Sequence, residues 1–323
     1  MTKFTGIDIS KQSFDCSITL ENEKIESRKF SNDLEGFAKL KKLLCSESHV
    51  VMEASGPYYL RLATFLHQEG IKVSVVNALI IRRFCQMRMM RTKTDKKDAI
   101  MIREYAKLEN PGLWKPDEPL ILKLKNLNTM VELLDKGITA TSNQLEAFKE
   151  MPGTDKSVLD QLKSILEFNE KSKENIELEM EEIVKENFSN TYKSLLSIPG
   201  IGKKTAALLI AITGNFKKFD HYKQLIAYVG LNPRVFESGS SVKGRGHICK
   251  MGTSRLRKTI YLCSWSAKKS NPQCIEMYKR LKEKSKPNKV INVALANKLL
   301  RQAFAMGKYQ REYEKNYQKI FVN

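Results

Sequence analysis

Four acidic residues near the start of the chain have types and spacings that suit metal-dependent chemistry on phosphodiester bonds: Asp8, Glu53, Asp95 and Asp98. Asp8 lies within one apolar strand pattern and Glu53 ends another, and a lone charge in such a place is costly. Asp95 and Asp98 are three residues apart in a helix-start pattern, so both lie on one helix face. Together the four carboxylates can hold two Mg²⁺ or Mn²⁺ ions about 4 Å apart, which activate an attacking oxygen and stabilise a leaving one.

Each of these acids taken alone also has a structural explanation, as a strand end, a helix N-cap or a surface acid. As a set, with one acid in the first strand, one ending the fourth and two opening a late helix, they have the layout of a ribonuclease H-like nuclease core. The segment between Glu69 and Asp95 contains no acid. Its basic residues suit the approach of a phosphate backbone, and they are Lys72, Arg82, Arg83, Arg88, Arg91 and Lys93.

A second pattern, from Ser197 to Ala206, matches a helix-hairpin-helix turn. Gly200 and Gly202 permit a tight turn, and the N–H groups that open the next helix can bind a phosphate, helped by Lys203 and Lys204. Such a turn contacts the DNA backbone rather than the bases. An ordinary packing turn between two helices is the alternative interpretation.

A serine-rich and glycine-rich loop follows, with Ser238, Ser240 and Ser241. From Ser238 through Ile275 the chain has no acidic residue and eight basic ones. A serine in such a positive loop can be a nucleophile whose alkoxide is stabilised by nearby cations, although composition alone also fits a plain connecting loop. The basic residues predicted to form a phosphate-facing patch are Lys243, Arg245, Lys250, Arg255 and Arg257.

The elements that must position these residues change in kind along the chain. Residues 1–112 alternate strand and helix patterns in the order β-β-β-α-β-α-β-α, which predicts a mixed α/β sheet. Within it, Asn32-Asp33 can cap a helix that runs through Leu44. Residues 113–190 carry apolar residues at steps of three and four, broken at Pro152-Gly153, which predicts a helical hairpin or coiled-coil linker. Residues 191–323 are basic and helical. We therefore expect three parts, an α/β domain, a linker and a helical domain.

The composition indicates a nucleic-acid partner. The 323 residues include 56 Lys and Arg against 36 Asp and Glu, a net charge of +20, and such an excess favours a polyanion as partner. A lysine-rich proteome is the alternative explanation. No apolar run approaches the ~20 residues of a membrane-spanning helix, and no signal peptide is evident. The six cysteines form no CxxC pair, so we expect reduced thiols in the cytoplasm.

Seven motifs of this chain resemble those of the insertion-sequence-110 family of transposases, which includes the Piv-type DNA invertases. In the front part the motifs are GIDISK, MEASGPY and KTDKKDA, which carry Asp8, Glu53, Asp95 and Asp98 onto the family's DEDD domain. In the rear part they are IPGIGKKTA, AYVGLNPR, ESGSSVKGRG and ICKMGTSRLRKTIY. The resemblance covers nearly the whole chain.

The resemblance implies more than the residues do by themselves. It implies a RuvC-like domain that binds Mg²⁺ or Mn²⁺, a helical linker and a helical domain whose nucleophilic serine matches Ser238, with Ser240 and Ser241 as neighbours that keep this assignment open. It also implies a composite site shared between subunits of a homodimer or homotetramer. The expected partners are donor DNA, target DNA and a structured bridge RNA, in a bacterial or archaeal cytoplasm in association with the nucleoid.

Two other functions remain open from the residues. A structure-selective DNA nuclease, like a Holliday-junction resolvase, would use the four acids for hydrolysis and leave the serine loop without a role. A nucleic-acid-binding protein without activity would need neither the acids nor the serine. The substitutions Ser238→Ala and Asp8→Asn distinguish these functions.

Overall fold

The computed structural model of this chain describes residues 2–20, 22–90, 94–234, 237–238, 242–243 and 247–315, with only the backbone at 237–238 and 242–243. The chain divides into two compact units, residues 1–116 and 117–323. We call them the front unit and the rear unit and describe each by itself.

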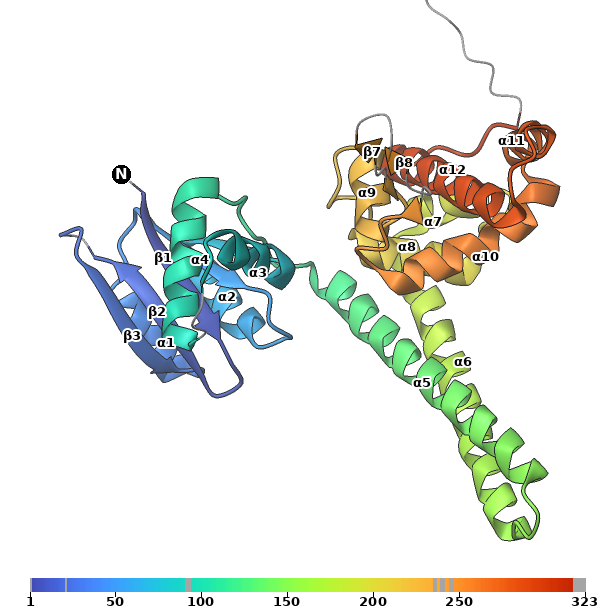
Figure 1. Cartoon of the computed structure of the whole chain (residues 1–323), viewed down its shortest axis with the longest axis horizontal. Helices are drawn as coiled ribbons and strands as arrows, with labels where there is room; N and C mark the ends of the chain where they lie inside the picture. Colours follow the sequence, from blue (N-terminus) through green and yellow to red (C-terminus); the bar gives the residue numbers. More distant parts are fainter. Residues whose placement is uncertain are drawn as a thin grey trace, which may run out of the picture. The chain divides into compact units, whose positions relative to one another are not determined.

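The front unit is built on one five-stranded sheet (Figure 1). The strands follow the order β3-β2-β1-β4-β5 across it. The first three strands form an antiparallel meander, whereas β4 and β5 run parallel to β1. The predicted mixed sheet is therefore confirmed. The strand bounds are β1 Lys3–Ile9, β2 Ser13–Thr19, β3 Ile25–Ser31, β4 Ser48–Glu53 and β5 Lys72–Val76.

Helices cover both faces of this sheet. One face packs Phe14, Leu40 and Leu62 into a core with the first two helices, and the other packs Val51, Ile81 and Ile102 with the next two. Asp33 caps the first helix, as predicted, by accepting a hydrogen bond from the Gly36 N–H at 2.8 Å. The helix bounds are α1 Leu34–Lys41, α2 Tyr59–Gln68, α3 Ala78–Met87 and α4 Asp95–Glu109.

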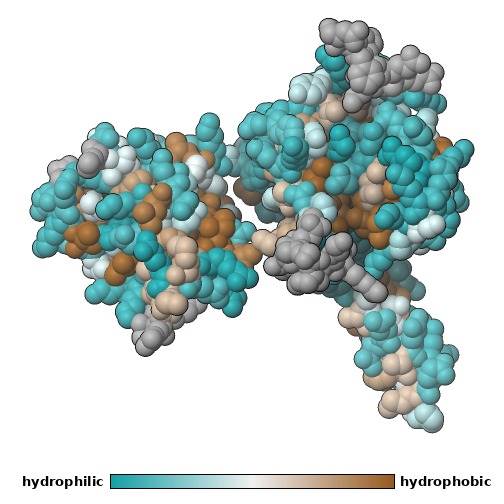
Figure 2. Space-filling model, turned by 45° about the horizontal axis from the view of Figure 1, so that its top comes forward, coloured by the Kyte–Doolittle hydropathy of each residue, from teal (hydrophilic) through white to brown (hydrophobic). Residues whose placement is uncertain are grey.

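The rear unit begins with two long antiparallel helices, α5 Pro119–Glu150 and α6 Lys156–Asn187 (Figure 1). They turn at Pro152-Gly153, where the sequence predicts the break. The ends nearest the rest of the rear unit are buried in its core, whereas apolar side chains farther along are exposed. Figure 2 shows such brown and tan side chains among hydrophilic ones on the projecting part of this hairpin.

The rest of the rear unit is a helical body around α8, whose residues Thr205–Thr213 are all buried. A helix that is apolar on every side belongs inside a core, and α8 meets α5, α6, α7 and α10 there. No helix among the described residues has the length and apolar character needed to span a membrane. The helices are α7 Ser189–Leu196, α8 Lys203–Thr213, α9 Tyr222–Val229, α10 Ser254–Ser270, α11 Pro272–Glu283 and α12 Asn288–Tyr309.

Four two-residue strands lie between α9 and α10. They are β6 Pro233–Arg234, β7 Glu237–Ser238, β8 Val242–Lys243 and β9 His247–Ile248. They pair as two antiparallel ladders, β6 with β9 and β7 with β8. The long hairpin and the helical body share one core. The division into three parts at 112 and 190 therefore stays a prediction.

Candidate functional site

Gly6 determines how closely α4 approaches the strand that carries Asp8. A Cβ at Gly6 would lie 2.3 Å from the backbone oxygen of Ala99 and 2.3 Å from the backbone nitrogen of Arg103. Only a residue without a side chain leaves room for this helix. Because side chains alternate along a strand, Asp8 lies on the same face as Gly6. The glycine two positions before Asp8 thus brings that aspartate to the face on which α4 lies.

The start of α4 carries the next two acids. Thr94 is the N-cap, with its side chain accepting from the Lys97 N–H at 3.3 Å, so Asp95 is the first helical residue rather than the cap. Asp95 and Asp98 both fall in the first turn, where the positive end of the helix dipole favours a carboxylate. The predicted pairing of these two acids on one helix turn is confirmed.

Glu53 reaches the same edge of the sheet through the parallel pairing of β1 with β4. In that register Ile7 lies opposite Met52, so the next position places Glu53 beside Asp8. The carboxylate of Glu53 accepts a hydrogen bond from the Ser55 hydroxyl at 3.0 Å. Glu53 therefore has a fixed partner at the strand end and faces the acid that the sequence pairs with it.

The electrostatics of Asp8 show that the four acids converge. Burial of this half-buried side chain, and then the nearby charges of Asp98, Glu53 and Asp95, raise the pKa of Asp8 to about 6. Like charges disfavour the ionised form when they are close. The structure therefore brings the four predicted acids into one negatively charged cluster.

Asp15 is a fifth acid of this cluster, and it was not predicted. It lies directly opposite Asp8 in the β1–β2 ladder and contributes to the raised pKa of Asp8. A lysine side chain, Lys29 on β3, lies 3.5 Å from its carboxylate. Because cross-strand neighbours follow from hairpin register, the short turn after Ile9 is the signal that points to Asp15.

The cluster suits Mg²⁺ or Mn²⁺ by its chemistry, because both ions prefer carboxylate oxygens. Burial first, and then the neighbouring carboxylates, raise the pKa of Asp8, so a bound cation would relieve the cost of its charge. Across the described part of the chain, however, no three His, Cys, Asp or Glu side chains meet closely enough to ligate one ion. The acids thus gather without forming a closed coordination shell.

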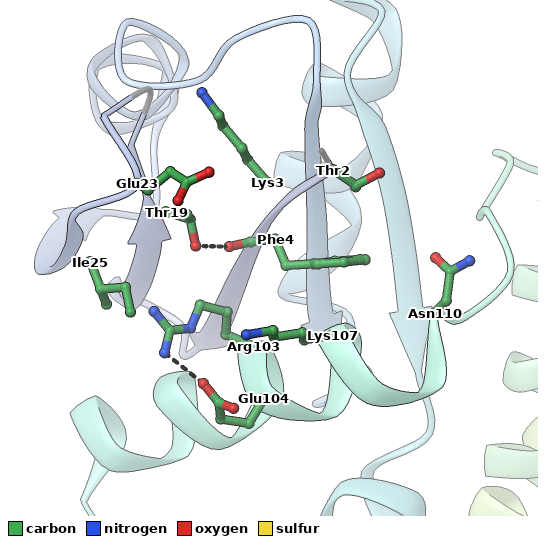
Figure 3. Close-up of a pocket in the computed structure, with 10 residues that line it drawn as sticks. All are labelled: Thr2, Lys3, Phe4, Thr19, Glu23, Ile25, Arg103, Glu104, Lys107 and Asn110. Atoms are coloured by element: carbon green, nitrogen blue, oxygen red, sulfur yellow. Dashed lines mark hydrogen bonds and ion pairs between the residues drawn. The ribbon is translucent and has the colours of Figure 1, made fainter.

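A pocket of about 540 Å³ lies at the other end of β1 (Figure 3). It is lined by Lys3 and Phe4 from β1 and by Arg103 and Lys107 from α4. Within it the Arg103 guanidinium donates to the Glu104 carboxylate at 2.7 Å. None of the five clustered acids lines this pocket, so the pocket and the acidic cluster are separate features.

The basic segment before α4 is exposed where it is described. Arg82, Arg83 and Arg88 lie on the surface of α3 or directly after it. The guanidinium of Arg88 stacks over the Phe84 ring at 5.5 Å. Arg91 and Lys93 lie outside the described residues.

In the rear unit the predicted hairpin turn requires its first glycine. Gly200 has a φ of +101°, and a Cβ there would lie 2.7 Å from the Cβ of Ala267 on α10. Gly202, by contrast, has nothing within 4 Å of such a Cβ and is the N-cap of α8 without a side-chain cap. The first N–H groups of α8 therefore open beside an uncovered glycine, as a phosphate-binding turn requires.

The two lysines of this turn are not free. Lys204 pairs with Glu177 at 2.6 Å, and Lys203 pairs with Glu181 at 3.1 Å, both on α6. Both lysine side chains remain more than half exposed. They connect the hairpin turn to the long helices as well as facing solvent.

The serine loop has a described base, and most of its remainder lies outside the described residues. Ser238 lies opposite Val242 in the β7–β8 ladder. Gly252 has a φ of +126°, and a Cβ there would lie 1.9 Å from the carbonyl oxygen of Tyr228. The absence of a side chain at Gly252 therefore lets the end of the loop pack against α9. Ser240, Ser241 and Arg245 lie outside the described residues.

The basic residues predicted beside the loop divide into two kinds. Arg257 donates to the carbonyl oxygen of Val229 at 2.7 Å, and Arg255 donates to that of Asn128 at 2.8 Å. Arg257 thus binds the end of α9, and Arg255 binds a carbonyl oxygen within α5. Lys250 is exposed, and Lys243 is the residue opposite Glu237 in the β7–β8 ladder.

Two family models match the chain. One, described as "Transposase", matches residues 5–148, and the other, described as "Transposase IS116/IS110/IS902 family", matches residues 192–279. The pilin gene-inverting protein of Moraxella lacunata is 31% identical over 323 residues, which cover 97% of this chain and 98% of that protein. The chain belongs to the IS110 family of transposases.

Two other proteins are similar to this chain over most of their length. The pilin gene-inverting protein of Moraxella bovis is 30% identical over 97% of this chain and 98% of its own length. The transposase for insertion sequence element IS1111A of Coxiella burnetii is 26% identical over 80% of this chain and 76% of its own length. The first family model spans the acidic cluster and α4, and the second spans the hairpin turn, Ser238 and α10. The resemblance that the motifs indicate is thereby confirmed.

Proposed function

We propose that this IS110-family transposase cuts and rejoins DNA with a metal-binding acidic cluster in its front unit and a nucleophilic serine, Ser238, in its rear unit. The observation that carries the proposal is the gathering of the acids around Asp8, whose pKa is raised to about 6 by burial and then by their charges. Family membership supports a DNA-rearranging reaction. The strand order β3-β2-β1-β4-β5 supports a ribonuclease H-like, RuvC-like front domain.

Asp8, Glu53, Asp95 and Asp98 would hold Mg²⁺ or Mn²⁺. When bound, the ion neutralises charge on a phosphate and polarises an oxygen next to the bond that breaks. The protein's part is to hold four carboxylates on rigid elements, with Gly6 fixing α4 against β1 and Thr94 fixing its first turn. A dication held by the four carboxylates would offset their mutual repulsion.

Ser238 would supply the covalent step. Its Oγ forms a bond to a DNA phosphorus while one ester bond of the DNA backbone breaks, and the released strand end leaves as a hydroxyl that takes up a proton. A strand-end hydroxyl then attacks the phosphoserine, reforms a DNA ester and returns the serine. The excess of cations from Ser238 to Ile275 supports this role, because positive charge stabilises the serine alkoxide and the phosphate.

The active assembly would contain more than one copy of the chain, as a homodimer or homotetramer, with the acids of one subunit beside the serine of another. Residues 117–188 would mediate this association. Support comes from exposed apolar side chains along the hairpin, which are Met130, Leu133, Ile165 and Phe168. The net charge of +20 supports simultaneous binding of donor DNA, target DNA and a structured bridge RNA near the nucleoid.

The experiment is a complementation assay between two inactive variants, Asp8→Asn and Ser238→Ala. Each variant alone should fail to recombine a donor and a target DNA in the presence of the bridge RNA and Mg²⁺. An equimolar mixture should recover activity, because mixed assemblies contain intact acids and an intact serine at one composite site.

A mixture as inactive as its components would contradict the composite site. If Ser238→Ala alone cleaved DNA at the wild-type rate, the alternative of a metal-dependent, structure-selective nuclease would hold instead. The recombinase and the nuclease use the same acids, so only the Ser238→Ala variant distinguishes these two functions.

A further inference from the structure

Helix α10 presents two different faces. Leu256, Ile260, Ser264 and Ala267 are fully buried and pack into the core of the rear unit. The Gly200 turn lies against Ala267. These contacts fix the rotation of the helix about its axis and turn the opposite face away from the core of the rear unit.

That opposite face alternates aromatic, apolar and basic side chains. Trp265 is 52% exposed and Leu262 is 57% exposed. Lys258 and Lys269 are exposed on the same face, one turn before and one turn after them. We call the set Lys258, Tyr261, Leu262, Trp265, Lys268 and Lys269 the α10 face. An indole is costly to leave in water, because it carries the largest apolar area of any side chain.

The two aromatic rings of the α10 face contact each other, and one of them lies beneath a lysine ammonium. Tyr261 and Trp265 meet edge to face, with ring centroids 6.4 Å apart. The Lys268 ammonium lies 5.3 Å from the Trp265 ring centroid and 6.0 Å from that of Tyr278 on α11. The Trp265 ring therefore has a positive charge over one face and remains 52% exposed.

The charge of the α10 face is not neutralised within the rear unit. Among the described residues, Lys258, Lys268 and Lys269 have no acid within ion-pair distance, whereas Lys203, Lys204 and Lys217 each do. The sequence contains no acid from Ser238 to Ile275. The α10 face is therefore complementary to a polyanion that also carries flat rings.

We propose that the α10 face binds an unpaired stretch of nucleic acid, with one base stacked on Trp265 and the flanking phosphates at Lys258 and Lys269. In a duplex the flat faces of the bases are covered by their neighbours, so an exposed indole suits unpaired bases. An RNA loop and a displaced DNA strand share this chemistry. The inference deepens the proposed function, since a recombinase exposes unpaired strands, but it requires neither cleavage nor metal.

The test uses tryptophan fluorescence in the full-length chain. The chain has two tryptophans, and Trp114 is partly buried in the front unit against His67. In the Trp114→Phe background, Trp265 is the reporter. Titrations in EDTA would use oligo-dT and oligo-rU of about 16 nucleotides and a DNA duplex of equal length. Both single strands should quench Trp265 more strongly than the duplex does, and the tighter of the two identifies the source.

Binding measured by anisotropy of the labelled oligonucleotides completes the test. Trp265→Leu should lower affinity for the single strands about 5- to 100-fold and leave duplex affinity within about twofold, whereas Trp265→Tyr should keep most of the affinity. Tyr309→Leu is the matched control, because Tyr309 is an aromatic residue 65% exposed on α12 of the same unit, and its affinity should equal that of the wild type.

Unquenched Trp265 fluorescence on oligonucleotide binding would overturn the inference, whether or not the leucine variant folds. So would equal single-strand affinity in wild type and Trp265→Leu. If Trp265→Leu instead changed the sedimentation of the protein and left affinity unchanged, the α10 face would be an interface between copies of this chain, and the inference would be wrong.

Discussion

The two regions that carry the proposed chemistry are built in opposite ways. In the front unit, acids of like charge are held together by a five-stranded sheet and a capped helix, so the cluster has its position before any ligand arrives. In the rear unit, Ser238 lies on a two-residue strand and begins a segment, Ser238 to Ile275, that has basic residues and no acid. The front unit holds like charges close together despite their repulsion, whereas the rear unit uses its excess of positive charge to bind its ligand.

The two regions therefore need ligands of opposite charge. Repulsion among carboxylates is relieved by a small dication, which demands precise and rigid ligands. A surplus of lysine and arginine is relieved by a phosphate backbone, which tolerates looser geometry because the attraction is long-range. Under the proposed function, rigid placement is needed at the acids, whereas the DNA and a neighbouring subunit would place the serine.

The largest expected effect comes from removing the charge of Asp8. Asp8→Asn should reduce DNA cleavage at least about 100-fold, because the cluster loses a metal ligand. The same variant should raise the melting temperature of the metal-free protein at neutral pH. Since the folded pKa of about 6 lies above the unfolded value of 3.8, ionised Asp8 costs stability once the pH exceeds that range.

Cleavage assays and thermal melts in EDTA measure both effects of Asp8→Asn. Glu35→Gln is the control, because Glu35 is an exposed acid on α1 of the same unit, and it should keep full activity. An Asp8→Asn protein that melts at a lower temperature than the wild type in EDTA would show that the cluster is not repulsive.

The next largest effect separates the two glycines of the hairpin turn. Gly200→Ala should destabilise the protein by about 2–4 kcal/mol, because it combines a positive φ with an overlap against Ala267. Gly202→Ala has open space and should cost less than about 1 kcal/mol. Urea unfolding measures both, and equal destabilisation would contradict the described packing of the turn against α10.

The pH dependence of metal binding should follow Asp8. Below about pH 6 this carboxylate holds a proton that a metal ion must displace, so Mn²⁺ affinity should fall up to about tenfold per pH unit there. Above that pH the affinity should level off. Calorimetric titrations with Mn²⁺ from about pH 5 to about pH 8 measure this, and a flat profile would separate Asp8 from the metal site.

The smallest effect concerns the paired lysines of the hairpin turn. Glu177→Gln frees Lys204 from its 2.6 Å ion pair and should strengthen duplex binding about two- to fivefold, with a steeper salt dependence. Glu170→Gln makes the same charge change at an exposed position of α6 and should alter binding less. If duplex affinity stayed the same and the melting temperature fell, the Lys204–Glu177 ion pair would only stabilise the packing of the long hairpin.

The sequence predicted the elements whose signals are local. The strand patterns, the cap at Asp33 and the break at Pro152-Gly153 depend on neighbouring residues, and all three are confirmed. The convergence of Glu53 with Asp8 was also predictable, because parallel strands of one sheet bring their carboxyl ends to one edge. Element ends differed by a few residues, as at α1, which stops at Lys41 rather than Leu44.

Long-range pairing could not be read in this way. The partnership of Asp15 with Asp8 needs the register of a hairpin, and the ion pair between Lys204 and Glu177 needs the packing of α6 against α8. Arg255 and Arg257 look like phosphate contacts in a basic run, but each binds a carbonyl oxygen on a distant helix. A charge pattern in the sequence gives the net charge of a region. It does not show which cationic side chains already bind groups within the protein.

The most direct measurement is covalent trapping of DNA by the protein. Wild type, Ser238→Ala and Asp8→Asn would be incubated with labelled donor and target DNA, the element's RNA and Mg²⁺, and then run on a denaturing gel. The account predicts label that migrates with wild-type protein and is absent from both variants. Cleaved DNA that is free of protein and persists in Ser238→Ala would contradict the nucleophilic serine and leave a metal-dependent nuclease.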